Sequence, residues 1–251
     1  MDRPVYQINF AGHPLRISFL HPGTRYLLWP LPRRCEGTDY DIRVEQQQLE
    51  AIRAAFPPDS SDPYLEYRCL LGEVGRTLLR WHCCVFHAVA FMWRGRAWLL
   101  TAPPETGKST QYFNWFRLHP EEITIISGDM PVIEQRDDGR VWVHPSAWNG
   151  KENIATLNSA PLGGLVLLEQ GKENRMEPLS PREAIQPLMK QMMAIPGDED
   201  EVRAVTSLLE ALLRAVPCRK MINLGDDAST ELLRQTWIRD LEKGDPAAAI
   251  E

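Results

Sequence analysis

The 251-residue sequence lacks the segments that would place a protein in a membrane or direct it across one. It holds no apolar run near the roughly 18 residues that span a bilayer. The start, Met1-Asp2-Arg3-Pro4, has no basic stretch followed by an apolar one, so we expect no signal peptide. These absences predict a cytoplasmic protein without a membrane partner.

Cysteines are few and unsuitably spaced for a disulfide framework or a zinc site. They are odd in number and include no CxxC pair: Cys35, Cys69, Cys83, Cys84 and Cys218. We expect them to be small buried side chains in a reducing compartment. Cys83 and Cys84 are adjacent, and on a strand they would face opposite sides.

Basic clusters are lacking too. The formal net charge is −6, with 28 Lys and Arg against 34 Asp and Glu, so a nucleic-acid partner is disfavoured. Hydrophobic residues at 43% and charged residues at 25% are typical of a globular protein. The length allows one large domain, or one domain with a smaller lobe, and leaves homo-oligomer formation open.

The first 62 residues differ in pattern from the rest. Residues 5–10 and 15–20 read as a strand hairpin, many prolines follow, and 45–56 could form a short helix. We therefore expect an accessory lobe over 1–62. From 63 to 244 strands and helices alternate, which predicts an α/β domain, and 245–251 reads as a flexible tail.

Within 63–244 the expected strands are 84–93, 96–101, 122–127, 130–135, 140–144, 162–170 and 219–224, and the expected helices are 64–79, 109–118, 181–194, 201–216 and 227–244. Asp62 reads as the N-cap of the first helix, with Pro63 at its first position. We expect strand 122–127 to lie beside strand 96–101.

Residues 102–110, Ala-Pro-Pro-Glu-Thr-Gly-Lys-Ser-Thr, lie between an expected strand and an expected helix. A phosphate-binding loop needs inward N–H groups, a helix N-terminus, a lysine for the outer phosphates and a hydroxyl for the metal. The loop therefore indicates a site for ATP with Mg²⁺. Its expected nucleotide contacts are Ala102, Glu105, Thr106, Gly107, Lys108, Ser109 and Thr110.

The loop departs from the G-x-x-x-x-G-K-[ST] pattern in three ways. Ala102 replaces the first glycine, Pro103 and Pro104 remove two N–H donors, and Glu105 adds a negative charge. Two other interpretations stay open: a chance strand-turn-helix, and a loop that once bound ATP and now binds it weakly or not at all.

Several segments together resemble the C-terminal kinase domain of HPr kinase/phosphorylase and, more distantly, the P-loop of phosphoenolpyruvate carboxykinase. Uncharacterised bacterial HPr-kinase-like proteins, some linked to peptide modification, are more similar still. The resemblance covers roughly residues 64–240 and is carried by His87-Ala88-Val89, the loop 102–110, ISGD at 126–129, AWNGK at 147–151, the strand 161–170 and Asn174-Arg175. It implies a P-loop kinase core of the HPr kinase/PEP carboxykinase type with a small N-terminal accessory lobe.

The resemblance implies an ATP- and Mg²⁺-dependent phosphotransferase that acts on a hydroxyl, which in HPr kinase belongs to a protein serine. Lys108 matches the phosphate-binding lysine, Ser109 the metal-linked hydroxyl, and His87 the family's histidine. Asp129 matches one of two adjacent acids in the family. Because Gly128 stands at the other position, Asp129 as base and Asp129 as metal ligand both remain open.

Other residues complete the expected site. Lys151 and Arg175 could add positive charge, Glu152 could replace the missing acid at the metal, and Trp148 could contact the substrate. Structural roles compete with these. His87 could be a core histidine, Asp129 a turn cap, and Trp148 with Lys151 a packed loop with a solvated lysine.

Two functions of different classes follow. The first is a kinase that transfers the γ-phosphoryl group of ATP to a protein, a peptide or a small alcohol. The second is a catalytically degenerate nucleotide-binding module that acts by recognition, for instance in peptide modification.

Overall fold

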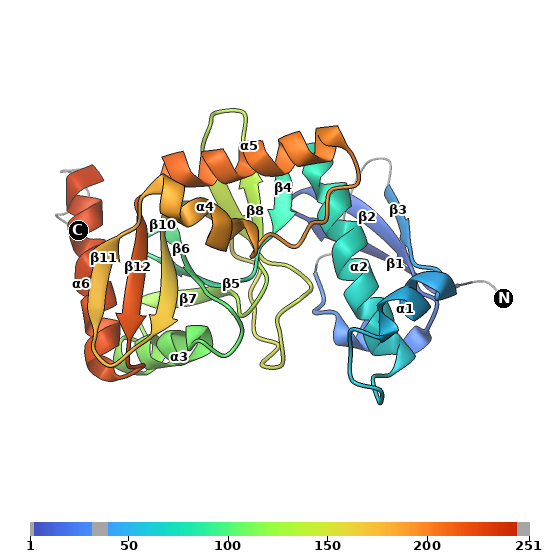
Figure 1. The fold of residues 1–251 in the computed structure, drawn as a ribbon, viewed down its shortest axis with the longest axis horizontal. Coiled ribbons are helices and arrows are strands. Elements are labelled where there is room, and N and C mark those ends of the chain that lie inside the picture. Colours follow the sequence, from blue (N-terminus) through green and yellow to red (C-terminus); the bar gives the residue numbers. More distant parts are fainter. Residues whose placement is uncertain (1–2, 32–39, 245–251) are drawn as a thin grey trace.

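The computed structural model describes residues 3–31 and 40–244. Cys35 and the tail expected at 245–251 lie outside these residues. The described chain is a mixed α/β structure, with a three-stranded sheet at one end and a curled nine-stranded sheet covered by helices (Figure 1). None of its helices combines the length and the apolar character that crossing a bilayer requires.

The small sheet contains the expected N-terminal hairpin. Strands β1 (Val5–Phe10) and β2 (His13–Ser18) are antiparallel, and the two turn residues between them both have positive φ. This turn matches the right-handed twist of the strands. A third strand, β3 (Tyr40–Arg43), pairs in parallel with β2 and was not predicted.

Two helices and two 3-10 turns pack beside this sheet. They are η1 (Pro22–Leu27), α1 (Gln46–Arg53), α2 (Asp62–Leu78) and η2 (Leu79–Trp81). Ser61, and not Asp62, is the N-cap of α2, because its hydroxyl accepts the N–H of Tyr64. Pro63 then follows one position later than expected. The apolar cluster here combines the small sheet and α2 with side chains of the large sheet and Trp148.

The large sheet has the order β4-β8-β9-β10-β6-β5-β7, with β12 also on β10 and β11 on β12. The long strand β10 pairs with β9 at its start, with β6 along its middle and with β12 towards its end. The strands are β4 (Cys83–Val85), β5 (Ala88–Trp93), β6 (Arg96–Thr101), β7 (Ile123–Ser127), β8 (Val132–Gln135), β9 (Val141–His144), β10 (Ala160–Gln170), β11 (Arg175–Pro178) and β12 (Cys218–Asn223).

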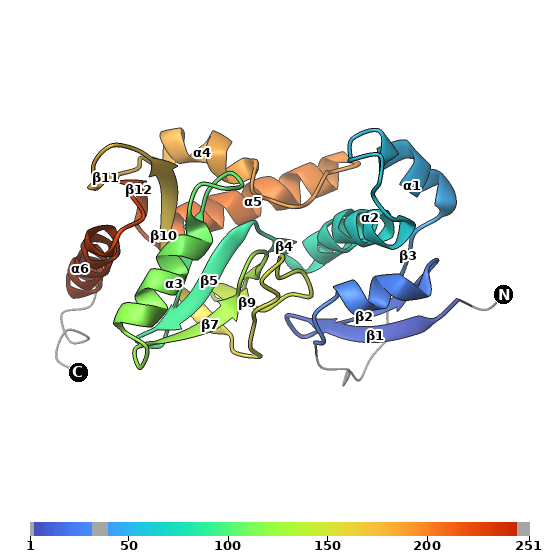
Figure 2. The ribbon, with the colours of Figure 1, turned by 90° about the horizontal axis from the view of Figure 1, so that it is seen from below.

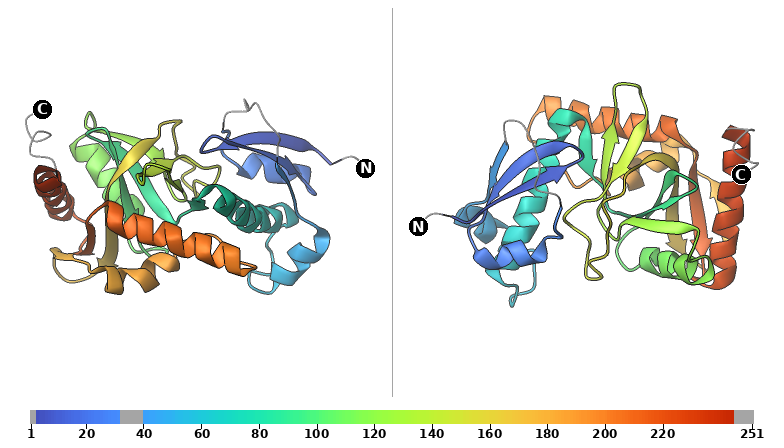
Figure 3. Two further views of the ribbon diagram at one scale, coloured as in Figure 1. Left: turned by 90° about the horizontal axis from the view of Figure 1, so that it is seen from above. Right: turned by 180° about the vertical axis from the view of Figure 1, so that it is seen from behind.

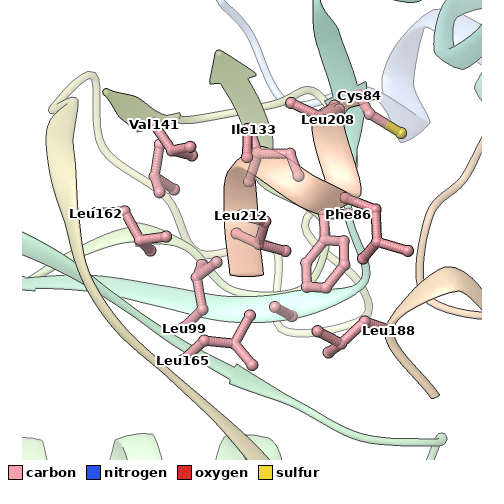
Figure 4. Close-up of a cluster of buried hydrophobic side chains, with 14 of the residues drawn as sticks. Cys84, Phe86, Leu99, Ile133, Val141, Leu162, Leu165, Leu188, Leu208 and Leu212 are labelled. Atoms are coloured by element: carbon pink, nitrogen blue, oxygen red, sulfur yellow. The ribbon is translucent and has the colours of Figure 1, made fainter. Parts of the chain in front are cut away.

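Helices cover both faces of this sheet, as Figures 2 and 3 show. On one face α3 (Lys108–Leu118) and α6 (Asp227–Gly244) pack on a cluster that contains four buried tryptophans. On the other, α4 (Pro181–Met189) and α5 (Glu199–Ala215) pack on Leu99, Leu165 and their neighbours (Figure 4). Strand β5 alternates between the two clusters with the period of two that a strand dictates.

The expected strand 84–93 is two strands in the structure. Residues 83–85 form β4, which pairs with β8, whereas residues 88–93 form β5 between β6 and β7. The apolar run hides the break because both strands are buried on both sides. Cys83 and Cys84 do face opposite sides, since each belongs to a different apolar cluster.

Strand β7 does not lie beside β6, so that prediction is wrong. Strand β5 is inserted between them and is antiparallel to both. Because β6 and β7 therefore run in the same direction, they still end at the same edge of the sheet, at Thr101 and Ser127. The first residues of β5 lie at this edge as well.

Helix α4 ends at Met189 and not near residue 194 as expected. The following residues bond to the β4–β5 connection instead: the N–H of Met193 donates to the Val85 carbonyl at 2.8 Å, and the N–H of His87 donates to the Gln191 carbonyl at 2.8 Å. The helix thus gives way to short turns after Met189, and the Gln191 carbonyl and Met193 N–H bond to the β4–β5 connection.

Candidate functional site

A pocket of about 980 Å³ lies at the edge where β6 and β7 end and β5 begins. Most of the predicted site residues line it. They are His87, Glu105, Gly107, Lys108, Ser109, Thr110, Asp129, Lys151 and Glu152. Segments that are far apart in the sequence therefore meet at this pocket, as their shared sheet edge requires.

The loop 102–107 joins β6 to α3 in a conformation held by hydrogen bonds within the loop and from β10. The Thr106 hydroxyl donates to the Pro103 carbonyl at 2.8 Å, and the Gln170 amide donates to the Glu105 carbonyl at 3.0 Å. Glu105 and Gly107 have positive φ, at +63° and +105°. The conformation is rare for Glu105, whereas glycine adopts it freely.

Lys108 is the first residue of α3 and is 7% exposed. Its ammonium donates to the Ala102 carbonyl at 3.0 Å and to the Pro103 carbonyl at 3.3 Å. Burial lowers the pKa of Lys108, and the negative charge of Asp129 opposes part of that effect. The ammonium lies at the helix N-terminus, where backbone N–H groups already favour an anion.

Asp129 follows β7 and contacts the residue that precedes β5. Its Oδ1 lies 3.4 Å from Nε2 of His87, and Nδ1 of His87 lies 2.8 Å from Oε1 of Gln191. The Asp129 carbonyl also accepts the N–H of Ala88 at 2.8 Å. Backbone and side-chain contacts together fix the Asp129 carboxylate beside a histidine whose ring is itself held in place.

The loop that carries Lys151 and Glu152 packs directly on Asp129. Gly150 has a φ of +64°, and a Cβ built there would lie 3.2 Å from Cγ of Asp129. The neighbouring Gly128 is equally confined, because a Cβ there would lie 2.8 Å from Cγ1 of Ile154. An acid at position 128 would therefore need the 149–154 loop to move, whereas Glu152 reaches the pocket from that loop.

Four predicted site residues do not line the pocket. Trp148 is fully buried between Phe10 and Tyr67, so it is not available to a substrate. Arg175 is exposed on β11, where it pairs with Glu177 at 3.0 Å. Ala102 is buried and Thr106 turns back onto the loop, so both shape the loop from within.

Other lining residues were missed by the sequence analysis. They are chiefly Arg68 on α2 and the segment after α4, represented by Lys190, Gln191 and Met193. No local motif marks them, because each reaches the pocket only through the packing of distant elements. The 104-residue separation of Gln191 from His87 illustrates this.

Comparisons with known proteins give weak structural similarity and no match in sequence. No family model matches it, and no curated protein does. Among solved structures, the Hpr(Ser) kinase/phosphatase from Coxiella burnetii is similar at a TM-score of 0.34 and 12% identity, over 64% of this chain and 97% of that chain. A TM-score this low identifies neither a fold nor an activity, so both rest on the residues of this chain.

Proposed function

We propose that the pocket binds ATP with Mg²⁺ and that the chain transfers the γ-phosphoryl group to a hydroxyl of a protein, a peptide or a small alcohol. One observation carries the proposal: Lys108 and Ser109, at the start of α3, line the same pocket as Asp129. The HPr-kinase-like motifs of the sequence and a P-loop core formed by β6, the loop and α3 agree with it.

The chain offers several phosphate contacts at this point. The first N–H groups of α3 have no partner within the helix and face an anion placed at its N-terminus. To bind a phosphate, the Lys108 ammonium has only to exchange its two carbonyl partners for phosphate oxygens. Arg68, Lys151 and Lys190 line the same pocket and add positive charge.

Oxygen ligands for Mg²⁺ are present in the same pocket. The Ser109 hydroxyl and the carboxylates of Asp129 and Glu152 are hard donors of the kind this ion prefers. Bound there, Mg²⁺ would neutralise charge on the phosphates. The residues present thus fit the ion, and Glu152 would replace the second acid that is missing at position 128.

Asp129 is the proposed base. In the transfer, the acceptor hydroxyl loses its proton to the Asp129 carboxylate, its oxygen bonds to the γ-phosphorus, and the bond to the β-phosphate oxygen breaks to release ADP. His87 acts as a positioning residue, because it contacts Asp129 on one side and Gln191 on the other.

ATP binding is tested by calorimetry with Lys108→Ala. The variant loses a charge-assisted contact in a partly desolvated site, so affinity should fall by about 1.5–3 kcal/mol, or roughly 10- to 150-fold in Kd. Lys172→Ala is the matched control, because Lys172 is exposed and does not line the pocket. Equal affinity for wild type and Lys108→Ala would refute the binding site.

Transfer is tested with γ-labelled ATP and Mg²⁺ against serine peptides and small alcohols. Asp129→Asn keeps the shape but cannot take the proton, so the rate should fall by about 100-fold or more while most ATP affinity remains. Asp137→Asn, in an exposed turn, is the control. An unchanged rate in Asp129→Asn would exclude Asp129 as the base.

One observation favours recognition without catalysis. Pro103 and Pro104 offer no N–H groups, and their loop already satisfies the Lys108 ammonium through two carbonyls. A wild type that binds ATP, yet transfers its phosphate to no acceptor and not to water, would establish this second function.

A further inference from the structure

A second pocket, of about 580 Å³, lies on another part of the molecule and shares no lining residue with the first. Three groups of metal-binding type meet beside it. A ring nitrogen of His13, the sulfur of Cys83 and a carboxylate oxygen of Glu134 all lie within 4.8 Å of one another. Only His13 and Glu134 are part of the pocket wall, and Cys83 is buried behind them.

The three residues come from three strands. His13 begins β2 of the small sheet, whereas Cys83 on β4 and Glu134 on β8 are direct partners in the large sheet. The register of the strands therefore fixes Cys83 beside Glu134. Cysteine spacing indicates no zinc site in the sequence, because these ligands are separated by dozens of residues.

His13 shows an unused ligand atom. Its Nε2 is buried and has no hydrogen-bond partner among the described residues. The ring cannot easily turn away, since it stacks on Trp81 with centroids 4.5 Å apart and planes 7° from parallel. A buried nitrogen without a partner is costly, and a metal ion would supply the missing partner.

Glu134 is supported in the manner of a metal-binding carboxylate. Its Oε2 lies 2.9 Å from Nε2 of His144 and accepts from Nε of Arg136 at 2.8 Å, while Nδ1 of His144 lies 2.9 Å from the Ser159 hydroxyl. Both contacts reach the same oxygen. Such outer partners orient ligands at metal sites and contribute to affinity.

We propose that His13, Cys83 and Glu134 bind one divalent transition-metal ion of the zinc type. Nitrogen, thiolate sulfur and carboxylate oxygen are the donors that Zn²⁺ takes, whereas Mg²⁺ takes oxygen. With bonds of about 2.0–2.3 Å, tetrahedral ligand atoms lie roughly 3.3–3.8 Å apart, so binding needs the side chains to draw together by about 1 Å. Water from the adjoining pocket completes the fourth position.

The metal site would have a structural role and would take no part in phosphoryl transfer. Its ligands join the small sheet to the large one, so the ion would fix the N-terminal hairpin on the body of the molecule. Without metal, the Cys83 thiol is a buried donor to the Trp81 carbonyl at 3.3 Å. On metal binding the thiol would release its proton to water in the adjoining pocket, and the thiolate sulfur would bind the ion.

The test uses the untagged full chain, reduced with a non-chelating reductant and stripped with EDTA. Zn²⁺ is titrated in competition with a chromogenic chelator, and Co²⁺ is added to a second sample as a spectroscopic probe. We expect one equivalent of either ion, a thiolate-to-cobalt charge-transfer band, and a melting temperature that rises with Zn²⁺.

Cys83→Ser should abolish the charge-transfer band. His13→Ala should lower the affinity for Zn²⁺ by more than the roughly 10- to 100-fold that loss of a residue supporting a ligand costs. Cys218→Ser and His119→Ala are matched controls, since Cys218 is buried elsewhere and His119, at the end of α3, does not line this pocket. His13 is only half-buried, so its variant keeps the test valid if Cys83→Ser does not fold.

The proposal is overturned if the wild type binds no stoichiometric Zn²⁺, or if His13→Ala binds it as tightly as the controls do. Neither result bears on ATP binding, which is measured at the other pocket.

Discussion

At residue 150 the chain needs a glycine for two separable reasons. The φ of +64° strains any other residue, and a Cβ would lie 3.1–3.3 Å from three side-chain atoms of Asp129. Gly150→Ala should therefore displace the proposed base and lower phosphoryl transfer, in addition to a backbone cost of about 1–2 kcal/mol. Transfer rate and melting temperature are measured together.

Gly139→Ala separates the two effects. Gly139 has a φ of +79° but no atom within 4 Å of a Cβ, so the control carries the strain without the contact. We expect it to lower the melting temperature and to leave transfer unchanged. Equal transfer by both variants would show that the position of Asp129 does not limit the reaction.

Local motifs explain which site residues the sequence could predict. Lys108 and Ser109 stand in a short pattern between a strand and a helix, and Asp129 follows a recognisable strand. Trp148 shows the limit of the same reasoning. The sequence predicted it as a substrate contact, but an apolar ring is equally common in a core, and here the ring is buried in the core.

Among the elements, β10 depends on the pair Gly163-Gly164. A Cβ at 164 would lie 2.5 Å from Cζ3 of Trp98, whose Nε1 donates to the Trp93 carbonyl at 3.0 Å and whose ring lies 4.3 Å from that of Trp237. Because this ring cannot move away, Gly164→Ala should overpack the core and lower the free energy of unfolding by about 1–3 kcal/mol.

Urea denaturation measures that change, and Gly72→Ala is the control. Gly72 lies within α2 with no atom within 4 Å of a Cβ, so alanine there should stabilise the protein by about 0.5–1 kcal/mol. Stabilisation by both alanines would mean that Trp98 is free to shift.

Elements with a clear period or a clear turn were predictable, and those set by partners were not. The hairpin β8–β9 could be predicted because Asp137-Asp138-Gly139 marks its turn, and the structure confirms it. Strands β3 and β11 have four residues each and were missed, since such short runs show no period. The position of β5 between β6 and β7 depends on pairings between segments distant in the sequence.

For the whole molecule, an ion pair joins α2 to the start of α5. Nε of Arg76 donates to Oε2 of Glu201 at 3.1 Å across 125 residues. This hydrogen bond, followed by one from the Gly197 backbone, lowers the pKa of Glu201. A lowered folded-state pKa stabilises the protein above the unfolded-state pKa, about 4.3, and that stabilisation is lost as the pH falls through the folded-state value.

Glu201→Gln should therefore melt below the wild type at neutral pH, and the two should converge as the pH falls below about 4. Glu199→Gln, at a side chain that is 94% exposed, is the control and should follow the wild type more closely. Melting temperatures measured between neutral and acid pH decide the matter. A constant difference between wild type and Glu201→Gln at every pH would contradict the proposed linkage.

The segment after α4 determines when the pocket can form during synthesis of the chain. Phe86 forms an isolated β-bridge with Met192, and the ring of His87 is held by Gln191, which lies 104 residues further along the chain. Chains are synthesised from the N-terminus, and contacts between such distant residues close late. On the ribosome, a nascent chain that already contains the phosphate-loop candidate and Asp129 still lacks the segment that orients His87. The pocket is therefore completed only when most of the protein has been made.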